Sequence, residues 1–316
     1  MASFVAIVPR KNILIAPYFP KKSLTGNVDV CIHNPTNSTF LLTTVIYIMI
    51  APGRVISGDG RRRTEEFVRQ LNAVMADSGI SESVIARLRG QFASGGENNL
   101  NKGIPIIADA ELYLPNDAIV RYSRTLVGLL CDQISEKFHN LKSLVSDNGK
   151  SATAISSLTT FTLCGSGTSM AEFGRFHNIE LEHLAFFSNY LVRPIRGAIA
   201  TITTEQRLAD GWQYGYCPAC GLWARMGHID SHEGGRKLWC LGCGFSWQFP
   251  RLCCPFCLER RPDQLGFLRV DETDRFRVYT CDSCRRYLKT VVATHDETVP
   301  FDVEYLSSSA YDVTAS

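Results

Sequence analysis

Paired cysteines constrain this chain more than any other feature. Eight of its twelve cysteines form four Cys-x-x-Cys pairs in the C-terminal third. The pairs are Cys217/Cys220, Cys240/Cys243, Cys254/Cys257 and Cys281/Cys284. Two intervening residues let both sulfurs of a pair face one ion at about 2.3 Å. Two successive units of Cys-x2-Cys, a spacer of about twenty residues and Cys-x2-Cys therefore predict two tetrahedral four-thiolate metal sites.

Four pairs can be combined into two sites in three ways. Joining neighbours closes two hairpin-length loops, whereas the interleaved alternatives need a cross-braced module, so we expect the sequential scheme. Cys253 is adjacent to Cys254 and is an alternative ligand with x3 spacing. We assign Cys254 because two residues separate it from Cys257, as in the other three pairs.

The ligand type limits the chemistry of these sites. Zinc and iron both accept tetrahedral sulfur, so the sequence leaves the metal open between them. Four thiolates fill the coordination shell and leave no position for substrate. We therefore predict two structural metal ions, no catalytic residues and no further cofactor. The small hairpins between the pairs would obtain much of their folding free energy from the metal.

Composition and the N-terminal sequence bear on the compartment. The 316 residues are 45% hydrophobic and 20% charged, which is typical of globular proteins. The longest apolar run, residues 40–51, is well short of the roughly 20 residues that cross a bilayer. Pro9 and Pro17 interrupt an N-terminal stretch that has no basic leader, so we expect neither a secretory signal nor membrane insertion. These features predict a cytoplasmic protein, where paired cysteines bind metals more often than they form disulfides.

The charge of the cysteine-rich segment depends on metal loading. Residues 214–290 contain twelve Lys/Arg and eight Asp/Glu, a formal charge of +4. Each divalent ion with four thiolates carries a net charge of about −2, so the loaded segment is near neutral. This argues against a free phosphate-binding surface, and we expect several basic residues to lie near the sulfurs. The candidates are Arg236, Lys237, Arg251, Arg260, Arg261, Arg285 and Arg286.

Apolar spacing predicts helices in the N-terminal part, although the first sixty residues give no assignable pattern. We expect one helix capped by Thr64, a second capped by Ser81, and a long helix over residues 116–144. Residues 146–169 are rich in Ser, Thr and Gly, which predicts a connector with one short strand. Helices over 179–190 and 195–202 follow, separated by Pro194.

Short strands between turns are expected beyond residue 214. Residues 222–229 and 236–239 predict one hairpin, and residues 265–270 and 276–280 predict another. The fold class is therefore α+β, with a mainly helical domain at 1–210. Two rubredoxin-like or zinc-ribbon β modules follow, at 211–250 and at 251–316.

An ordered set of residues around the cysteines resembles the formate dehydrogenase accessory protein family, FdhE. The set comprises Trp212, Cys217-Pro-x-Cys-Gly221, Leu238, Trp247, Arg251 and Tyr287-Leu288-Lys289, in addition to the other three cysteine pairs. The similar region covers about residues 180–295. The resemblance implies a cytoplasmic, non-enzymatic maturation factor with a helical domain and two rubredoxin-like modules. It also implies binding to the catalytic subunit of formate dehydrogenase during assembly.

Several interpretations compete with this one. The alternative functions are a nucleic-acid-binding zinc-ribbon protein and a rubredoxin-like electron carrier, and self-association is left open. His228 and His232 are candidate metal ligands, but solvent-facing turn positions are favoured because four cysteines are available. The aromatic and basic residues that we expect to flank a partner surface can instead pack the hairpin cores. They are Trp223, Trp239, Trp247, Tyr287 and Lys289.

Overall fold

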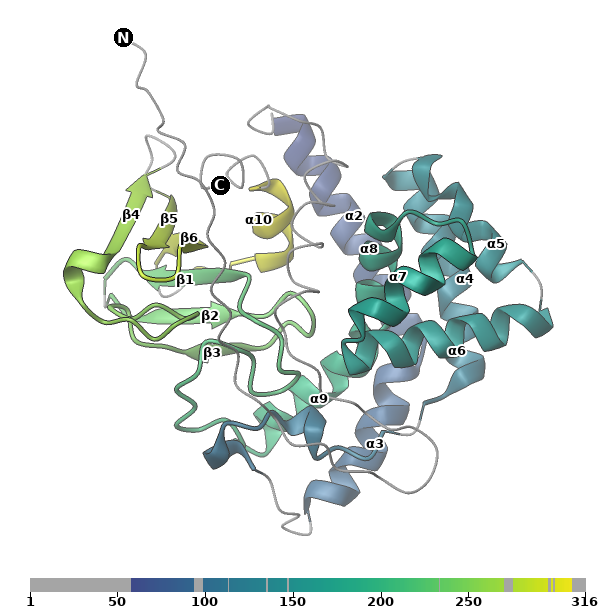
Figure 1. Cartoon of the computed structure of the whole chain (residues 1–316), viewed down its shortest axis with the longest axis horizontal. Helices are drawn as coiled ribbons and strands as arrows, with labels where there is room; N and C mark the ends of the chain where they lie inside the picture. The colour runs from purple at the N-terminus through teal and green to yellow at the C-terminus, as the bar shows by residue number, and fades with distance from the viewer. Residues whose placement is uncertain are drawn as a thin grey trace.

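The computed structural model places a group of helices beside a single β-sheet (Figure 1). It describes residues 58–308, except 94–98, 113, 135, 147, 233, 270–274, 295, 296 and 298. The apolar run at 40–51 lies outside these residues. The helices before the sheet are α2 (Gly58–Asp77), α3 (Ile80–Ala93), α4 (Asn116–Gln133), α5 (Lys142–Val145), α6 (Asn148–Cys164), α7 (Gly167–Phe176), α8 (Leu181–Leu191) and α9 (Arg193–Glu205). Among the described helices, none is long and apolar enough to cross a membrane.

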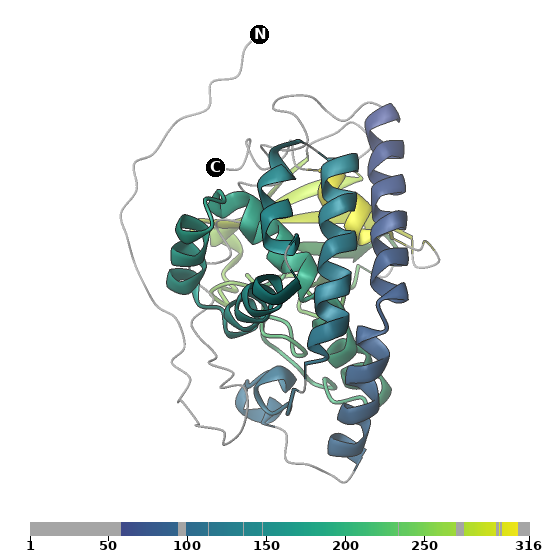
Figure 2. The same ribbon diagram turned by 90° about the vertical axis from the view of Figure 1, so that its right-hand side faces the viewer.

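Six strands and one helix make up the C-terminal part. They are β1 (Met226–Asp230), β2 (Arg236–Trp239), β3 (Ser246–Gln248), β4 (Leu265–Arg269), β5 (Phe276–Cys281), β6 (Arg286–Ala293) and α10 (Phe301–Ser307). Helix α10 lies between the sheet and α2, and α2 runs alongside α4 in front of the sheet (Figures 1 and 2). This arrangement confirms the α+β class with helices first and strands second.

One sheet joins both predicted hairpins. Strands β1 and β2 pair antiparallel, as do β4 and β5, and the strand order is β3-β2-β1-β6-β5-β4. The two halves meet where β1 and β6 run parallel, with Gly227 opposite Thr290. A Cβ on Gly227 would lie 2.9 Å from the Thr290 Oγ1, so this close approach favours glycine. The division of the chain after residues 210 and 250 stays a prediction.

The Ser/Thr-rich segment is helical, so the connector and strand predicted at 146–169 are wrong. It forms α6 and the start of α7. Inside α6, the hydroxyls of Thr159, Thr160 and Thr162 donate to carbonyl oxygens four residues earlier. These bonds satisfy the hydroxyls within the helix, so the side chains do not compete with its backbone hydrogen bonds.

Three other helix details differ from expectation. Helix α2 begins at Gly58, so Thr64 is not its N-cap, and its hydroxyl donates to the Gly60 carbonyl. Ser81 lies inside α3, where its hydroxyl donates to the Pro194 carbonyl. The predicted long helix is divided into α4, a 3-10 helix (Glu136–Leu141) and α5. Phe138 and Leu141, in the 3-10 helix, are fully buried. The apolar spacing of the sequence therefore continues through the break and does not reveal it.

Helix α10 fixes the sheet to the helical part. Its Phe301 stacks on Trp239 of β2, with ring centroids 5.5 Å apart and planes 15° apart. The Glu304 carboxylate is fully buried and accepts from Arg61 of α2 at 2.9 Å and from Arg275, just before β5, at 3.1 Å. Buried residues of the helices and the sheet therefore form one apolar core.

Candidate metal centres

The first centre contains Cys217, Cys220, Cys240 and Cys243. Sγ atoms of Cys217 and Cys243 are 3.5 Å apart, as are those of Cys220 and Cys240, and all four sulfurs lie within 4.8 Å of one another. A sulfur tetrahedron around an ion, with bonds of about 2.3 Å, has edges of about 3.8 Å. All four cysteines are buried. Neighbouring pairs combine as the spacing predicts, and the donor set fits a tetrahedral ion.

Tight turns bring the sulfurs of the first centre together. The N–H of Gly221 donates to the Cys217 carbonyl at 2.9 Å, and that of Gly244 donates to the Cys240 carbonyl at 2.8 Å. Both glycines have a left-handed backbone, with φ of 76° and 78°. Glycine adopts this conformation without the steric penalty that a Cβ brings. The two Cys-x-x-Cys-Gly sequences therefore encode these turns locally.

The second centre has the same geometry with less protection. It contains Cys254, Cys257, Cys281 and Cys284, whose closest sulfur pairs are 3.6 Å apart. Cys257 is exposed and Cys284 is half-buried. The second centre is thus open to solvent on one side, a difference from the first centre that the cysteine spacing does not indicate.

Non-glycine residues take the left-handed position in the second centre. Leu258 donates to the Cys254 carbonyl at 3.0 Å, and Arg285 donates to the Cys281 carbonyl at 2.7 Å. Their φ values are 61° and 53°. A left-handed conformation costs a non-glycine residue roughly 1–2 kcal/mol. Both turns therefore carry a strain that metal binding would offset.

Thiol ionisation is uneven within the clusters. In the first centre, burial raises the pKa of Cys217. Burial also opposes ionisation of Cys240, but hydrogen bonds with the other three thiols outweigh it and lower its pKa. In the second centre, a hydrogen bond with Cys284 lowers the pKa of Cys254 to about 5. Four clustered thiols cannot all ionise in close contact without a cation, and a bound divalent ion would supply that charge.

The first centre is attached to the helical part through its backbone. The Ile107 N–H donates to the Ala219 carbonyl, inside the Cys217/Cys220 turn, at 2.9 Å. Tyr216 adds a side-chain contact, because its hydroxyl donates to the Gly103 carbonyl at 2.6 Å. Neither the cysteine spacing nor the helix periodicity of the sequence indicates these two hydrogen bonds, because each joins residues more than 100 positions apart.

The candidates for a partner surface differ in burial. Trp239, Trp247 and Lys289 are buried, and Trp223 and Tyr287 are half-buried. The three buried residues pack the interior, which is the alternative expected for them, whereas a position of Trp223 and Tyr287 beside a partner surface stays a prediction.

The remaining candidate ligands lie outside both clusters. Cys253 is buried, and its Sγ approaches the Cys254 carbonyl at 3.7 Å. His228 is a buried residue of β1, so its assignment to a solvent-facing turn is wrong, whereas His232 is exposed. The four-cysteine sets are therefore complete without these residues.

Two of the basic residues that were expected near the sulfurs contact the segment around the Cys254/Cys257 turn. Arg286 places its guanidinium over the rings of Trp223 and Phe256, at 5.8 Å and 5.5 Å. Arg236 donates to the carbonyls of Pro250, at 2.5 Å, and of Cys253. These contacts hold the chain around the Cys254/Cys257 turn.

Sequence comparison shows that the chain is similar to FdhE proteins. No family model matches the chain. It is 30% identical over 117 residues to Protein FdhE of Escherichia coli K12, covering 35% of this chain and 36% of that protein. A Protein FdhE homolog of Yersinia pestis (strain Angola) is 30% identical over 114 residues, with the same coverage. The similarity thus spans about a third of the length of the curated relatives.

The fold comparison extends over most of the chain. The crystal structure of the FdhE protein from Pseudomonas aeruginosa matches with a TM-score of 0.56 and 17% identity. The match covers 88% of this chain and 89% of that one. The resemblance to the FdhE family is therefore confirmed, in sequence over about a third of the chain and in fold over most of it, with both four-cysteine clusters in the C-terminal half.

Proposed function

We propose that this protein is a cytoplasmic, non-enzymatic accessory factor for the formation of active formate dehydrogenase. The similarity to FdhE proteins is the observation that carries the proposal. Closed four-sulfur geometry supports it, because sites of this kind stabilise a fold and leave no position for a substrate.

Each centre takes one ion, zinc or iron, on its four cysteines. The ligands of the first centre are Cys217, Cys220, Cys240 and Cys243, and those of the second are Cys254, Cys257, Cys281 and Cys284. When bound, the ions neutralise part of the thiolate charge and fix the turns at both ends of each hairpin. The protein's own residues then present a rigid surface to the partner.

The partner surface consists of exposed apolar side chains around the second centre. Leu252, Leu258 and Phe267 are 46–69% exposed; Leu252 and Leu258 flank the Cys254/Cys257 turn, and Phe267 lines the same hollow as Leu252. Grouped exposed apolar side chains often mark protein-binding sites. This apolar surface, next to the exposed Cys257, is where we place the catalytic subunit of formate dehydrogenase.

Co-purification tests the proposal. Tagged protein, loaded with metal and isolated anaerobically, is expected to retain a formate dehydrogenase catalytic subunit from the cells that produce it. Loss of the gene is expected to abolish formate dehydrogenase activity without abolishing synthesis of that subunit. Failure to retain the subunit, together with normal activity in cells that lack the protein, would contradict the accessory role.

A pair of surface variants tests the location of the binding surface. The double variant Leu252→Ser/Leu258→Ser changes two exposed side chains on either side of the Cys254/Cys257 turn and is expected to retain less catalytic subunit. Phe176→Ser is the matched control, because Phe176 is 85% exposed and lies on α7, in the helical part. Equal retention by both variants would place the binding surface elsewhere.

Electron transfer is a second candidate function, favoured by exposure of the second centre. A redox-active ion held by Cys257 and Cys284 would lie close to solvent, where a redox partner could approach. This function requires iron. Elemental analysis and an absorption spectrum of anaerobically purified protein distinguish iron from zinc. Colourless zinc centres would eliminate electron transfer as the function.

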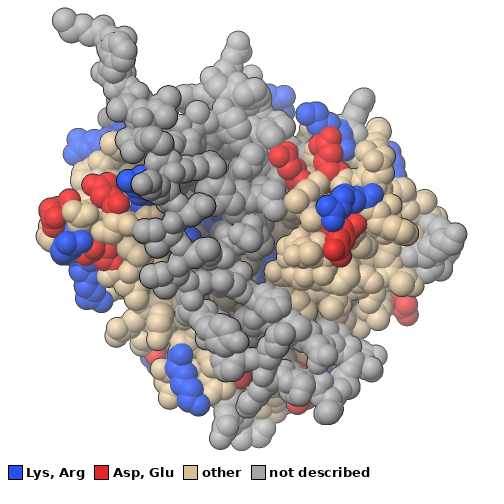
Figure 3. Space-filling view, viewed as in Figure 1, with Lys and Arg blue, Asp and Glu red and all other residues tan. Residues whose placement is uncertain are grey.

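Nucleic-acid binding fits the charge distribution less well. Where the described surface is visible in Figure 3, basic and acidic residues lie interspersed, with no basic stripe among them. A nucleic-acid-binding ribbon would show affinity that falls steeply with salt, as expected when bound phosphates release counterions. Self-association remains a prediction.

A further inference from the structure

Helix α9 brings two buried arginines to the first metal centre. Arg193 and Arg196 are one helical turn apart, so they lie on the same side of α9. Both side chains belong to buried residues, which are 7% and 5% exposed. Neither is among the basic residues that were expected near the sulfurs, because α9 precedes the cysteine-rich segment.

The side chain of Arg196 lies against the Cys240/Cys243 turn. Gly242 stands directly before Cys243, and a Cβ on Gly242 would lie 3.6 Å from the Nη1 atom of Arg196. Glycine therefore lets the guanidinium approach this turn closely. Arg193 is also near the turn. Burial opposes its charge, but Asp302 and, more weakly, Cys243 raise the pKa of Arg193 overall.

The two arginines differ in the groups that they bind. Arg193 donates to the Asp302 carboxylate of α10 at 2.6 Å, so an adjacent negative charge compensates it. Arg196 instead donates to the main-chain carbonyl of Thr162, in α6, at 2.8 Å. Its Nε has no hydrogen-bond partner among the described residues, and no described carboxylate forms an ion pair with it. Arg196 is therefore a buried cation without a described carboxylate beside it.

The loaded first centre would carry the opposite charge. A divalent ion with four thiolates has a net charge of about −2. All four cysteines of this centre are buried, so water does not screen that charge well. A buried charge is costly unless an opposite charge lies nearby. The attraction acts through space and needs no direct contact between the guanidinium and a sulfur atom, because the Coulomb interaction is long-ranged in a protein interior.

We infer that Arg196 is the charge-compensating residue of the first metal centre. Its guanidinium stays protonated, so it favours the ion bound by four thiolates over an empty site with neutral thiols. Through Arg196, the charge of the centre is coupled to α6 and α9 of the helical part. The inference concerns metal binding alone and does not rest on the proposed accessory role.

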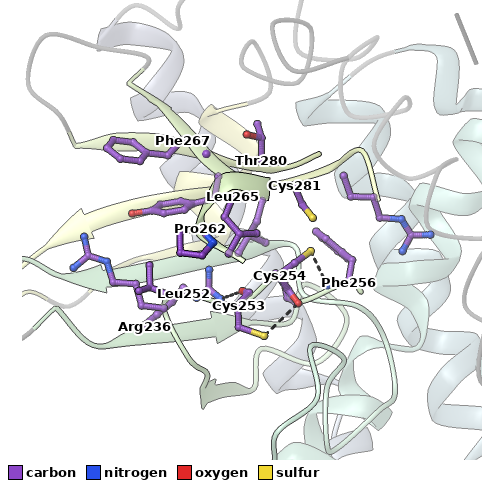
Figure 4. A pocket seen from close by; sticks show the side chains of 16 residues that line it. Arg236, Leu252, Cys253, Cys254, Phe256, Pro262, Leu265, Phe267, Thr280 and Cys281 are labelled. Atoms are coloured by element: carbon purple, nitrogen blue, oxygen red, sulfur yellow. Dashed lines mark hydrogen bonds between the residues drawn. The ribbon is translucent and has the colours of Figure 1, made fainter. Parts of the chain in front are cut away.

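The second centre has a buried arginine of its own. Arg236 is 3% exposed and donates to the Cys253 carbonyl, beside the ligand Cys254 (Figure 4). Burial lowers the pKa of Arg236 to about 10, although the thiols of Cys253 and Cys254 act in the opposite direction. The guanidinium is therefore protonated at neutral pH. Because each centre has a separate buried arginine, loss of the Arg196 charge is expected to affect the first centre only.

Reduction potentials test this inference in the full chain, reconstituted with iron at both centres. Arg196→Met removes the positive charge, whereas Arg196→Lys keeps it. A nearby cation stabilises the ferrous centre, which is more negative than the ferric one. Arg196→Met is therefore expected to lower the potential of one centre and to leave the other unchanged. Arg196→Lys is expected to keep both potentials close to those of the wild type. Loss of the hydrogen bond to Thr162 alone would not produce this pattern.

Chelator competition with the zinc-loaded chain gives a second readout. Arg196→Met is expected to weaken binding of the first ion by at least about ten-fold, because charges in the interior attract strongly. Arg124→Met is the matched control. Arg124 belongs to α4 in the helical part and also donates to a main-chain carbonyl, that of Val145, at 3.1 Å. It is expected to leave the affinity of both ions unchanged.

A shift at one centre in Arg196→Met, restored by Arg196→Lys and absent from Arg124→Met, supports the inference. Unchanged potentials and affinities in Arg196→Met overturn it. Equal changes at both centres, or equal effects of the lysine and methionine variants, overturn it as well, because the charge of Arg196 would then not act on the first centre. If Arg196→Met does not fold, Arg196→Gln carries the same test, since it is neutral and keeps a hydrogen-bond donor.

Discussion

The backbone N–H of Ile106 donates to the carbonyl oxygen of Pro218 across 2.8 Å. Pro218 lies between two ligands of the first centre, and Ile106 is a fully buried residue that follows the helices α2 and α3. The metal turn and the helical part are therefore in direct backbone contact. Changes at the first centre are expected to reach residues far from any cysteine.

Loss of the first centre is the first prediction. Cys217→Ser removes one ligand and is expected to lower metal content from two ions to one. Because the turn then loses its fixed shape, the amide protons of Ile106 and Ile107 are expected to exchange faster with solvent. The unfolding free energy is expected to fall by more than about 4 kcal/mol, because loss of a metal is one of the few causes of such large destabilisation.

Hydrogen exchange and thermal unfolding measure this effect. Cys131→Ser is the control, because Cys131 is buried but lies outside both clusters. If Ile106 exchanges at the wild-type rate in Cys217→Ser protein that has lost its metal, the hydrogen bond with Pro218 does not depend on the centre.

Unequal metal release is the second prediction. All four sulfurs of the first centre are buried, whereas Cys257 of the second centre is exposed. A chelator should therefore remove the second ion first, and release should follow two phases of similar amplitude. A chromogenic chelator in excess makes both phases visible.

Ligand variants assign the phases of release. Cys281→Ser is expected to remove the fast phase, and Cys240→Ser the slow one. A single phase from the wild-type protein, or loss of the slow phase in Cys281→Ser, would show that burial does not control release.

The buried carboxylate of α10 provides the third prediction. Glu304 is fully buried and binds Arg61 and Arg275, whose side chains are partly exposed. Glu304→Gln keeps the shape but loses the charge-assisted hydrogen bonds, so we expect a loss of about 1–3 kcal/mol in unfolding free energy. Chemical denaturation measures it.

A surface ion pair is the matched control for Glu304. Glu66 pairs with Arg69 at 2.5 Å, but both side chains are largely exposed. Such pairs contribute little to stability, so Glu66→Gln is expected to leave the denaturation midpoint unchanged. Equal effects from both variants would mean that burial of Glu304 is not the cause.

These elements also show what the sequence can predict. Both hairpins and the sequential pairing of the clusters follow from local spacing, because each hairpin closes its own pair of turns. The sequence does not predict helix α6, because serine and threonine side chains can hydrogen-bond to nearby backbone groups and so favour caps and turns. In the fold, their hydroxyls bond within the helix and its apolar face packs against α4.

Long-range contacts account for the rest of the differences. Strand β6 pairs with β1 about sixty residues earlier, and no local pattern specifies that partner. The same reason explains Trp239, which is buried because Phe301 of α10 stacks on it. Unequal exposure of the two centres also depends on what packs around them, which the repeated Cys-x-x-Cys motif does not encode.

Acid sensitivity is the fourth prediction. Burial lowers the pKa of His228 in the folded protein, and Lys237 acts in the same direction. The unfolded chain, with a histidine pKa of about 6.5, then binds more protons than the folded one. The contribution of His228 to stability is therefore complete above about pH 6.5 and is lost as the pH falls toward the lower folded pKa.

Thermal unfolding between pH 7.5 and 5.5 tests this sign. His228→Gln is expected to show a smaller fall in melting temperature than the wild type over that range. His139→Gln, at an exposed site, is expected to keep the wild-type slope. Acid loss of metal affects all three proteins alike, so identical slopes would exclude His228 as a source of the pH dependence.

X-ray absorption at the metal edge, combined with elemental analysis of anaerobically purified protein, tests the central claim most directly. The account predicts two ions per chain, each surrounded by four sulfur atoms at about 2.3 Å. Substitution of one cysteine in either cluster should remove one ion and leave the four-sulfur signal of the other. One ion or none in the wild-type protein, or a first shell containing oxygen or nitrogen, would contradict two closed four-cysteine centres.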